Sequence, residues 1–180
     1  MGTLSQSWST LTSAKVNSWN NLGAQVTRVN RFGDSTNYTG FSLFMRLNRN
    51  LNMCGLPAIT DAPLPPTLPE FVLGALQVNA TTPAISIAFT PTIPSGMYLA
   101  VYMTNNIVTG RTFVKNYYRF ITSKLEQTSP YTTGLLGLWN AVFPNVLVEG
   151  AKIYFKCKVI DGATGFDTVP AVGVQTVVTS

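Results

Sequence analysis

The sequence predicts a mainly β protein in which a β-sandwich follows a short helical arm and a proline-rich linker. Residues 70–180 contain short segments of alternating or β-branched apolar residues, separated by turns rich in Gly, Pro and Asn. Residues 1–56 instead carry apolar side chains at helical spacing. Five prolines within residues 57–69 favour an extended, semi-rigid spacer between the two regions.

The first helix is predicted to begin near residue 12. Thr12 or Ser13 can cap its amino terminus, and Leu11 can pack back onto the first turn. Val16 and Trp19 then lie on one face. The segment RFGDSTNYTG that follows predicts a turn.

The second helix is predicted to begin between Thr39 and Phe41 and to end before Gly55, which suits the left-handed stop position. Arg46 and Arg49 face away from its apolar stripe. That stripe consists of Phe41, Phe44, Leu47 and Leu51. Two short helices bury little surface by themselves, so we expect them to pack on the β domain or on another chain.

Six segments after residue 70 are predicted strands. They are FVLGALQVNA, AISIAFTP, MYLAVYMTN, RTFVKNYYRFI, AKIYFKCKVID and VGVQTVVT. Residues 151–160 show the alternation most clearly, with Ile153, Phe155, Cys157 and Val159 on the inner face. Short strands at this spacing favour a sandwich of immunoglobulin or fibronectin type III kind. The segment YTTGLLGLWNAVFPN is predicted to be a strand with a helical turn.

The composition favours a protein that is partly covered by partners. Apolar residues make up 46% of the chain and charged residues 11%, against roughly a quarter charged in ordinary soluble domains. A surface with so few charges is typical of a chain that contacts neighbouring copies or other proteins. The alternative is a monomeric β protein rich in Thr and Asn.

Most of the net charge of +5 comes from the first third of the chain. Up to residue 60, one acidic residue, Asp34, stands against five basic residues: Lys15, Arg28, Arg31, Arg46 and Arg49. Such an imbalance attracts acidic proteins or nucleic acid. Because these cations are scattered rather than clustered, we do not expect nucleic acid among the partners.

The remaining bulk features predict a chain that folds in a reducing compartment. Cys54 and Cys157 lie in different predicted modules and lack CxxC spacing, so both are expected to be reduced. The amino terminus lacks the apolar core of a signal peptide, and no apolar run is long enough to span a bilayer. We therefore expect no membrane partner.

No catalytic constellation is visible in the sequence. The chain has no histidine, which removes the commonest general base and metal ligand. Its seven acidic residues are dispersed, and no phosphate-binding glycine motif is present. We expect no enzymatic activity and no cofactor.

Two short segments leave alternatives open. Asp161 and Asp167 in DGATGFD are compatible with a calcium loop, but a hairpin turn at Gly162 and Gly165 explains the same residues. The segment KNYYRF interleaves aromatic and basic residues, as surfaces that stack on single-stranded nucleic acid or carbohydrate do. A half-buried strand produces the same pattern, and we favour this interpretation.

The chain resembles known proteins in both halves. Residues 148–178 resemble the last two strands of a fibronectin type III-like domain. The first half resembles a segment of tailed-phage and prophage structural proteins, particularly those of Bacteroidetes hosts. Its matching positions are Trp8, Leu11, Thr12, Trp19, Asn20, Asn30, Phe32, Gly33, Gly40, Phe41, Leu43, Phe44, Asn48 and Gly55. Lys15 stands where that segment usually has Gln or Glu, so the capping box is incomplete.

The resemblance implies a structural virion protein, made in the host cytoplasm, that joins neighbouring subunits of a capsid, connector or tail through its helical arm. The expected partners are other virion proteins and copies of the chain itself. The predicted partner-binding residues are Trp8, Trp19, Phe41, Phe44, Arg46, Leu47 and Arg49. The alternative is an adhesin whose sandwich loops bind a host glycan or receptor.

Overall fold

The computed structural model describes residues 2–29, 32–108, 110–111 and 113–179, and it divides the chain into two compact units. The helical unit comprises the chain up to Thr67 together with Asp161–Phe166. The β unit comprises Leu68–Ile160 and the chain from Asp167 onward. Strands dominate the chain and helices are few, so the prediction of a mainly β fold is confirmed.

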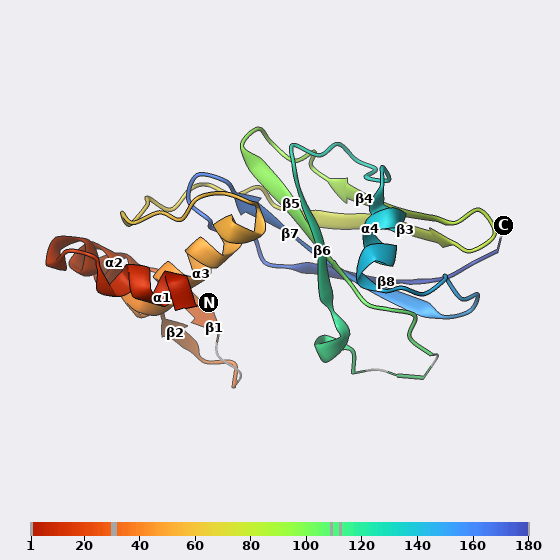
Figure 1. Ribbon diagram of the computed structural model, residues 1–180, viewed down its shortest axis with the longest axis horizontal. Coiled ribbons are helices and arrows are strands. Elements are labelled where there is room, and N and C mark those ends of the chain that lie inside the picture. Colours follow the sequence, from red (N-terminus) through yellow and green to blue (C-terminus); the bar gives the residue numbers. More distant parts are fainter. Residues whose placement is uncertain (1, 30–31, 109, 112, 180) are drawn as a thin grey trace. The chain divides into compact units, whose positions relative to one another are not determined.

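The helical unit contains three helices and a β-hairpin (Figure 1). The helices are α1 (Gly2–Ser9), α2 (Ser13–Gln25) and α3 (Gly40–Met53). Between α2 and α3 the chain forms β1 (Thr27–Val29) and β2 (Ser35–Asn37), which pair antiparallel. Contacts of α3 with both α1 and α2 hold the helices together.

The helix ends follow the local sequence signals. Thr12 is the N-cap of α2, and its side chain accepts a hydrogen bond from the Lys15 backbone N–H at 3.5 Å. Thr39 caps α3 in the same way, accepting from the Ser42 N–H at 3.2 Å. Gly55 has a φ of 72°, as the predicted stop position requires. The predicted cap at Thr12 is thus confirmed, although the residue at position 15 cannot complete a capping box.

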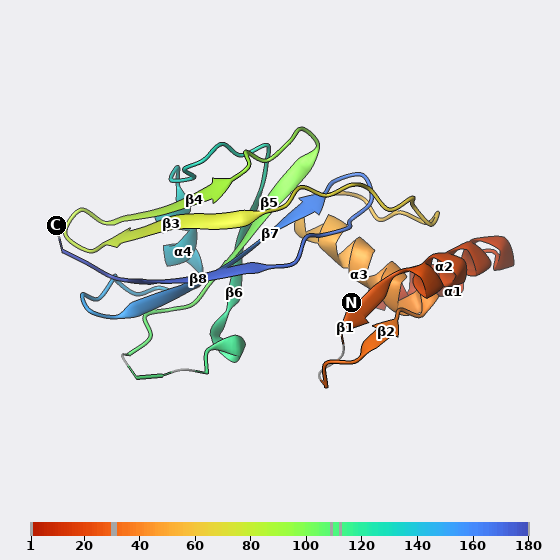
Figure 2. The same cartoon turned by 180° about the vertical axis from the view of Figure 1, so that it is seen from behind.

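The strands of the β unit form two small open sheets (Figure 2). A two-stranded sheet pairs β3 (Val72–Asn79) with β4 (Ala84–Thr90). A four-stranded sheet has the order β6-β5-β7-β8. Its strands are β5 (Met97–Met103), β6 (Arg119–Leu125), β7 (Lys152–Asp161) and β8 (Ala171–Thr176). A single parallel bridge between Asn79 and Val178 joins β3 to the segment after β8.

Two further elements complete the β unit. A short 3-10 helix, η1 (Lys115–Tyr117), precedes β6, so the described residues of the predicted strand RTFVKNYYRFI, which exclude Thr112, are β only from Arg119 onward. The helix α4 (Leu135–Val142) occupies the segment expected to hold a strand with a helical turn. It contacts β4 and β6, and its Trp139 is fully buried.

The core of the β unit is apolar and follows strand alternation. Ile153, Phe155, Cys157 and Val159 of β7 are fully buried, as the alternation of residues 151–160 predicts. The opposite face of β7 is less polar than expected, since Ile160 is also buried. Lys158 is buried as well, with its ammonium 2.9 Å from the Asp167 carboxylate. Among the described residues, no helix is long and apolar enough to cross a membrane.

Candidate functional site

The aromatic residues predicted to bind partners form a continuous cluster in the helical unit. Trp8 of α1 contacts Phe41 and Phe44 of α3, with ring centroids 5.6 and 5.2 Å apart. Trp19 of α2 contacts Phe44 edge to face at 5.2 Å. Such pairs add stability beyond the apolar area that they bury. The cluster therefore holds the three helices of this unit together.

The burial of three side chains changes the set of residues that can contact a partner. Trp19, Phe44 and Leu47 are fully buried inside the helical unit, so they offer no surface to a partner. The predicted amphipathic face of α3 exists, but it packs on the other elements of its own unit. Leu43 and Leu51, rather than Phe41, complete the buried stripe of α3.

Phe41 and Trp8 remain at the surface of the aromatic cluster. Phe41 is 42% exposed and Trp8 is partly exposed, although each contacts the other. The β1–β2 hairpin adds two exposed apolar side chains, Val29 and Phe32, at 72% and 75%. Contiguous exposed apolar side chains, such as Phe41 and Trp8, are typical of surfaces that bind proteins.

The two predicted arginines have different environments. Arg49 is exposed on α3. Arg46 is partly buried and lies over the Tyr38 ring, with its guanidinium carbon 5.3 Å from the ring centroid, and it donates a hydrogen bond to the Tyr38 hydroxyl. Arg28 lies over the same ring at 5.0 Å. Arg46 thus stabilises its own unit, whereas Arg49 is available to a partner.

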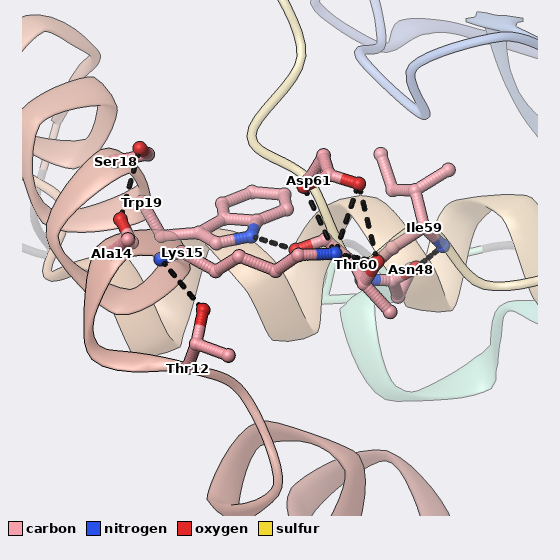
Figure 3. Close-up of polar contacts among 9 residues, drawn as sticks. All are labelled: Thr12, Ala14, Lys15, Ser18, Trp19, Asn48, Ile59, Thr60 and Asp61. Carbon is pink, nitrogen blue, oxygen red and sulfur yellow. Dashed lines mark hydrogen bonds and ion pairs between the residues drawn. The ribbon is translucent and has the colours of Figure 1, made fainter.

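The chain after α3 is fixed to the helices (Figure 3). The Asn48 side chain accepts a hydrogen bond from the Ile59 N–H at 2.6 Å and donates one to the Ile59 carbonyl at 3.1 Å. The Trp19 indole donates to the Thr60 carbonyl at 2.9 Å. Lys15 donates to the Thr60 hydroxyl at 2.8 Å and lies 3.0 Å from the Asp61 carboxylate.

These contacts change the interpretation of the predicted linker. Residues 57–67 belong to the helical unit, and Ile59 and Ala62 pack against its apolar cluster. Asn48 explains the difference, because its amide satisfies both backbone groups of Ile59 in a segment without a strand partner. The sequence gives no local signal for this, since an asparagine inside a helix is more often solvent exposed.

A second buried amide connects α3 to residues far along the chain. The Asn50 side chain donates to the Gly165 carbonyl at 2.8 Å. A Cβ atom at Gly165 would lie 2.4 Å from the Leu47 carbonyl oxygen, so only glycine permits this approach. Phe166 packs against the apolar cluster. Residues 161–166, predicted only as a hairpin turn, therefore complete the helical unit.

The acidic residues of DGATGFD have structural roles. The Asp161 carboxylate accepts hydrogen bonds from the Thr164 backbone N–H at 2.8 Å and from the Thr164 hydroxyl at 2.5 Å. Asp167 instead pairs with Lys158. Within the described part of the chain, no group of three His, Cys, Asp or Glu residues is arranged to hold a metal ion. The local geometry favours the hairpin turn.

Neither cysteine forms a disulfide. Cys157 is buried in the β unit, and this burial raises the pKa of its thiol to about 12. A thiol with so high a pKa is almost entirely protonated at neutral pH and is a poor nucleophile or metal ligand. Cys54 is partly exposed at the end of α3.

No protein family model and no curated protein matches this chain. Among solved structures, the chain is similar to a β-1,2-glucanase from Parabacteroides distasonis, with 19% sequence identity and a TM-score of 0.38. The similarity covers 63% of this chain and 14% of the glucanase chain. At this TM-score the similarity supports no conclusion about fold or activity.

Proposed function

We propose that the chain is a structural protein of a tailed-phage virion that joins neighbouring subunits through its helical unit. The observation that carries this proposal is the exposure of Phe41, next to partly exposed Trp8, at the edge of a cluster whose Trp19 and Phe44 rings are buried. Exposed Arg49 on the same helix supplies a polar contact at the rim. The low charge content of the whole chain also suits a surface that neighbours cover.

The helical unit acts in this proposal as a preformed module. Its buried aromatic cluster and the fixed segment after α3 order the exposed residues before binding. A rigid surface loses less conformational entropy on association than a flexible arm does. Trp8, Phe41 and Arg49 are therefore the contact residues, while Trp19, Phe44 and Leu47 position them. The proposal assigns no reaction and no cofactor to the chain.

We further infer that the β unit is a sandwich of immunoglobulin or fibronectin type III kind. The order β6-β5-β7-β8 corresponds to a C′-C-F-G sheet, and β3 and β4 correspond to strands A and B of the opposing sheet. Tyr131 forms an isolated bridge with Ile87 of β4, where a third strand of that sheet is expected. The helix α4 then follows in place of a regular strand.

The test measures whether the chain is present in assembled particles. Particles from cells that carry the gene are purified on a density gradient and probed with an antibody against the chain. We expect the chain in the particle fraction at a fixed ratio to the major capsid protein. Its absence from purified particles would reject the proposal.

A matched pair of variants locates the contact. Phe41→Ser is expected to lower incorporation into particles at least several-fold, and Leu64→Ser, an exposed leucine elsewhere in the same unit, is expected to leave it unchanged. Retention of the Trp19 and Trp139 indole signals in NMR spectra verifies that each variant is folded. Equal incorporation of both variants would remove Phe41 from the contact.

An adhesin is the second candidate, and one observation favours it. The Asn106 side chain bonds to the Val146 carbonyl at 2.8 Å and to the Val148 N–H at 3.2 Å, so two long connections of the β unit are joined. They expose Val108 and Val146. If the chain is an adhesin, the purified protein binds host cells directly, and Val146→Ser weakens this binding while Phe41→Ser does not.

A further inference from the structure

The outer face of the four-stranded sheet carries a group of aromatic and basic side chains. Val101 and Met103 of β5 point into the core and are fully buried, so Tyr102 between them points outward. Tyr102 is paired with Phe120 of β6, and their rings meet edge to face at 5.5 Å. Lys156 of β7 lies over the Tyr102 ring, its ammonium 5.2 Å from the centroid.

Lys156 is bracketed by two aromatic rings. Its ammonium also lies 5.9 Å from the centroid of Tyr118, which connects η1 to β6. We call Tyr102, Tyr118, Phe120 and Lys156 the aromatic–lysine face. Val172, opposite Lys156 in the β7–β8 register, is 66% exposed and extends this face with apolar surface.

The face has an excess of positive charge. Partial burial lowers the pKa of Lys156, and the nearby charges of Lys158 and Lys115 lower it further. Asp167 is the acidic group that acts in the opposite direction, and its carboxylate already lies 2.9 Å from the Lys158 ammonium. Because Lys158 is buried and paired with Asp167, the uncompensated positive charge here belongs to Lys156 and Lys115, and it favours an anionic ligand.

Exposed rings lie close to these charges. Phe120 is 37% exposed and Tyr117, in η1, is 39% exposed. Arg111 lies over the Tyr117 ring at 5.0 Å and donates a hydrogen bond to its hydroxyl. The Tyr154 hydroxyl donates to the Arg111 carbonyl at 3.3 Å, which connects this loop to β7.

We propose that the aromatic–lysine face, together with Lys115 and Tyr117 of η1, binds single-stranded nucleic acid, with phosphates at Lys115 and Lys156 and bases stacked on Phe120 and Tyr117. Proteins that bind single strands without sequence preference combine cations that follow the backbone with rings on which bases stack. A duplex buries its base faces and offers nothing to these rings, so the aromatic residues favour a single strand. An acidic protein would use the lysines but gain less from adjacent stacking surfaces.

This inference departs from the expectation that nucleic acid is not a partner. That expectation depended on the scattered cations of the first 60 residues, whereas the face is built in the β unit from residues that are distant in sequence. It includes Tyr118 and Phe120 of KNYYRF, for which we favoured a half-buried strand. The inference is also independent of the proposed assembly role, because none of its residues belongs to the helical unit.

The test measures fluorescence anisotropy of labelled oligothymidylate and oligouridylate with the full chain. Probes of about 15 nucleotides suit the site sizes of known single-strand binders, which are roughly 4–16 nucleotides. We expect binding that weakens with salt, with a slope of log K against log salt of about −1.4 for two phosphate contacts. No binding at low ionic strength would overturn the proposal.

Two variants with matched controls separate stacking from charge. Phe120→Ala is expected to weaken binding about 5- to 100-fold, as loss of one stacked base does. Phe32→Ala, an exposed phenylalanine of the helical unit, is expected to have no effect. Lys156→Met is expected to reduce the salt slope by about 0.7. The control is Lys124→Met. Lys124 is an exposed lysine of β6 that pairs with inward-pointing Leu99, so it does not belong to the outer face, and this variant is expected to leave the salt slope unchanged.

Competition identifies the class of ligand. Polyglutamate and heparin are added to the complex at charge concentrations equal to that of the oligonucleotide. We expect the unlabelled oligonucleotide to compete at least tenfold better than either polyanion. Equal competition by polyglutamate, together with unchanged binding of Phe120→Ala, would show a surface for acidic protein and overturn the proposal.

Discussion

The two units of this chain bury their polar backbone in different ways. In the β unit, strand pairing satisfies the backbone of the two sheets, and the core cluster consists mainly of aliphatic and aromatic side chains. In the helical unit, buried Asn48 and Asn50 bond to backbone groups of Ile59 and Gly165, which have no strand or helix partner there. Unpaired backbone groups inside a protein are costly. The β unit has such contacts too, at Thr104 and Thr168, but it adds a larger apolar core, so directional side-chain contacts carry more of the stability of the helical unit.

Each unit contains a reporter that makes this comparison measurable. The Trp19 indole donates to the Thr60 carbonyl in the helical unit, and the Trp139 indole donates to the Thr104 carbonyl in the β unit. Both indole N–H groups give NMR signals that can be followed separately during urea unfolding. The predictions below use these two signals, because one unfolding free energy need not describe a chain of two units.

The largest effect is expected from truncation of the β core. Phe155→Ala removes a fully buried ring of β7 and should lower the free energy of unfolding by about 3–5 kcal/mol. The urea midpoint of the Trp139 signal should fall more than that of Trp19. The control is Val169→Ala, at an exposed loop position, with little expected change. Equal shifts of both signals would show that the two units unfold as one.

The next effect is expected where two helices of the helical unit approach most closely. A Cβ at Gly40 would lie 2.7 Å from the Asn20 backbone nitrogen and 2.8 Å from the Trp19 carbonyl carbon. Backbone atoms cannot rotate away as a side chain can, so Gly40→Ala should destabilise this unit by up to about 3 kcal/mol.

Gly137 provides the control for this substitution. It lies in α4, and an added Cβ would meet nothing within 4 Å. Gly137→Ala should be neutral or stabilise by up to about 1 kcal/mol, because alanine favours helix more than glycine does. A larger loss from Gly137→Ala than from Gly40→Ala would contradict the close packing of α2 and α3.

A smaller effect is expected from the amide that fixes the segment after α3. Asn48→Ala leaves the Ile59 N–H and carbonyl without this partner and should cost roughly 2 kcal/mol, measured at the Trp19 signal. Asn52→Ala, at an exposed position of the same helix, should change stability little. If the two variants are equally stable, polar contacts do not distinguish the helical unit from the β unit.

The smallest effect is expected from alkylation of the two cysteines, one of which lies in each unit. Burial that raises the pKa of Cys157 to about 12 should leave its thiol protonated and unreactive at pH 8, whereas partly exposed Cys54 should react with iodoacetamide. Mass spectrometry of the native protein should find label on Cys54 alone. Rising pH increases the thiolate fraction of Cys157, but this fraction should stay small below its pKa. Early labelling of Cys157 would indicate that the β unit opens readily.

Local signals in the sequence predicted much of each unit. Thr12, Gly55 and the alternation of residues 151–160 act within one element, so their structural consequences are visible in a short window. Which element covers an apolar face cannot be predicted locally, because a helical stripe has the same sequence pattern whether its own unit or a partner covers it. For that reason Trp19, Phe44 and Leu47 were assigned to a partner although they are buried.

Contacts between distant residues could not be predicted. The bond from Asn50 to Gly165 joins positions 115 residues apart, and no residue between them indicates it. The aromatic–lysine face likewise combines β5, β6 and β7, and only the part in KNYYRF was visible as a pattern. Predicting either feature requires the register of the sheet and the path of the turn after β7.

The helical unit is built from two separate stretches of the chain, so it cannot be completed early in synthesis. Its first 67 residues leave the ribosome well before residues 161–166, which contain Gly165 and Phe166. At elongation rates of about 5–20 residues per second, roughly 6–23 s pass between synthesis of Asn50 and synthesis of its acceptor, Gly165. The nascent unit therefore exposes the site that Phe166 later covers, and it is open to chaperones or premature partners until residues 161–166 emerge.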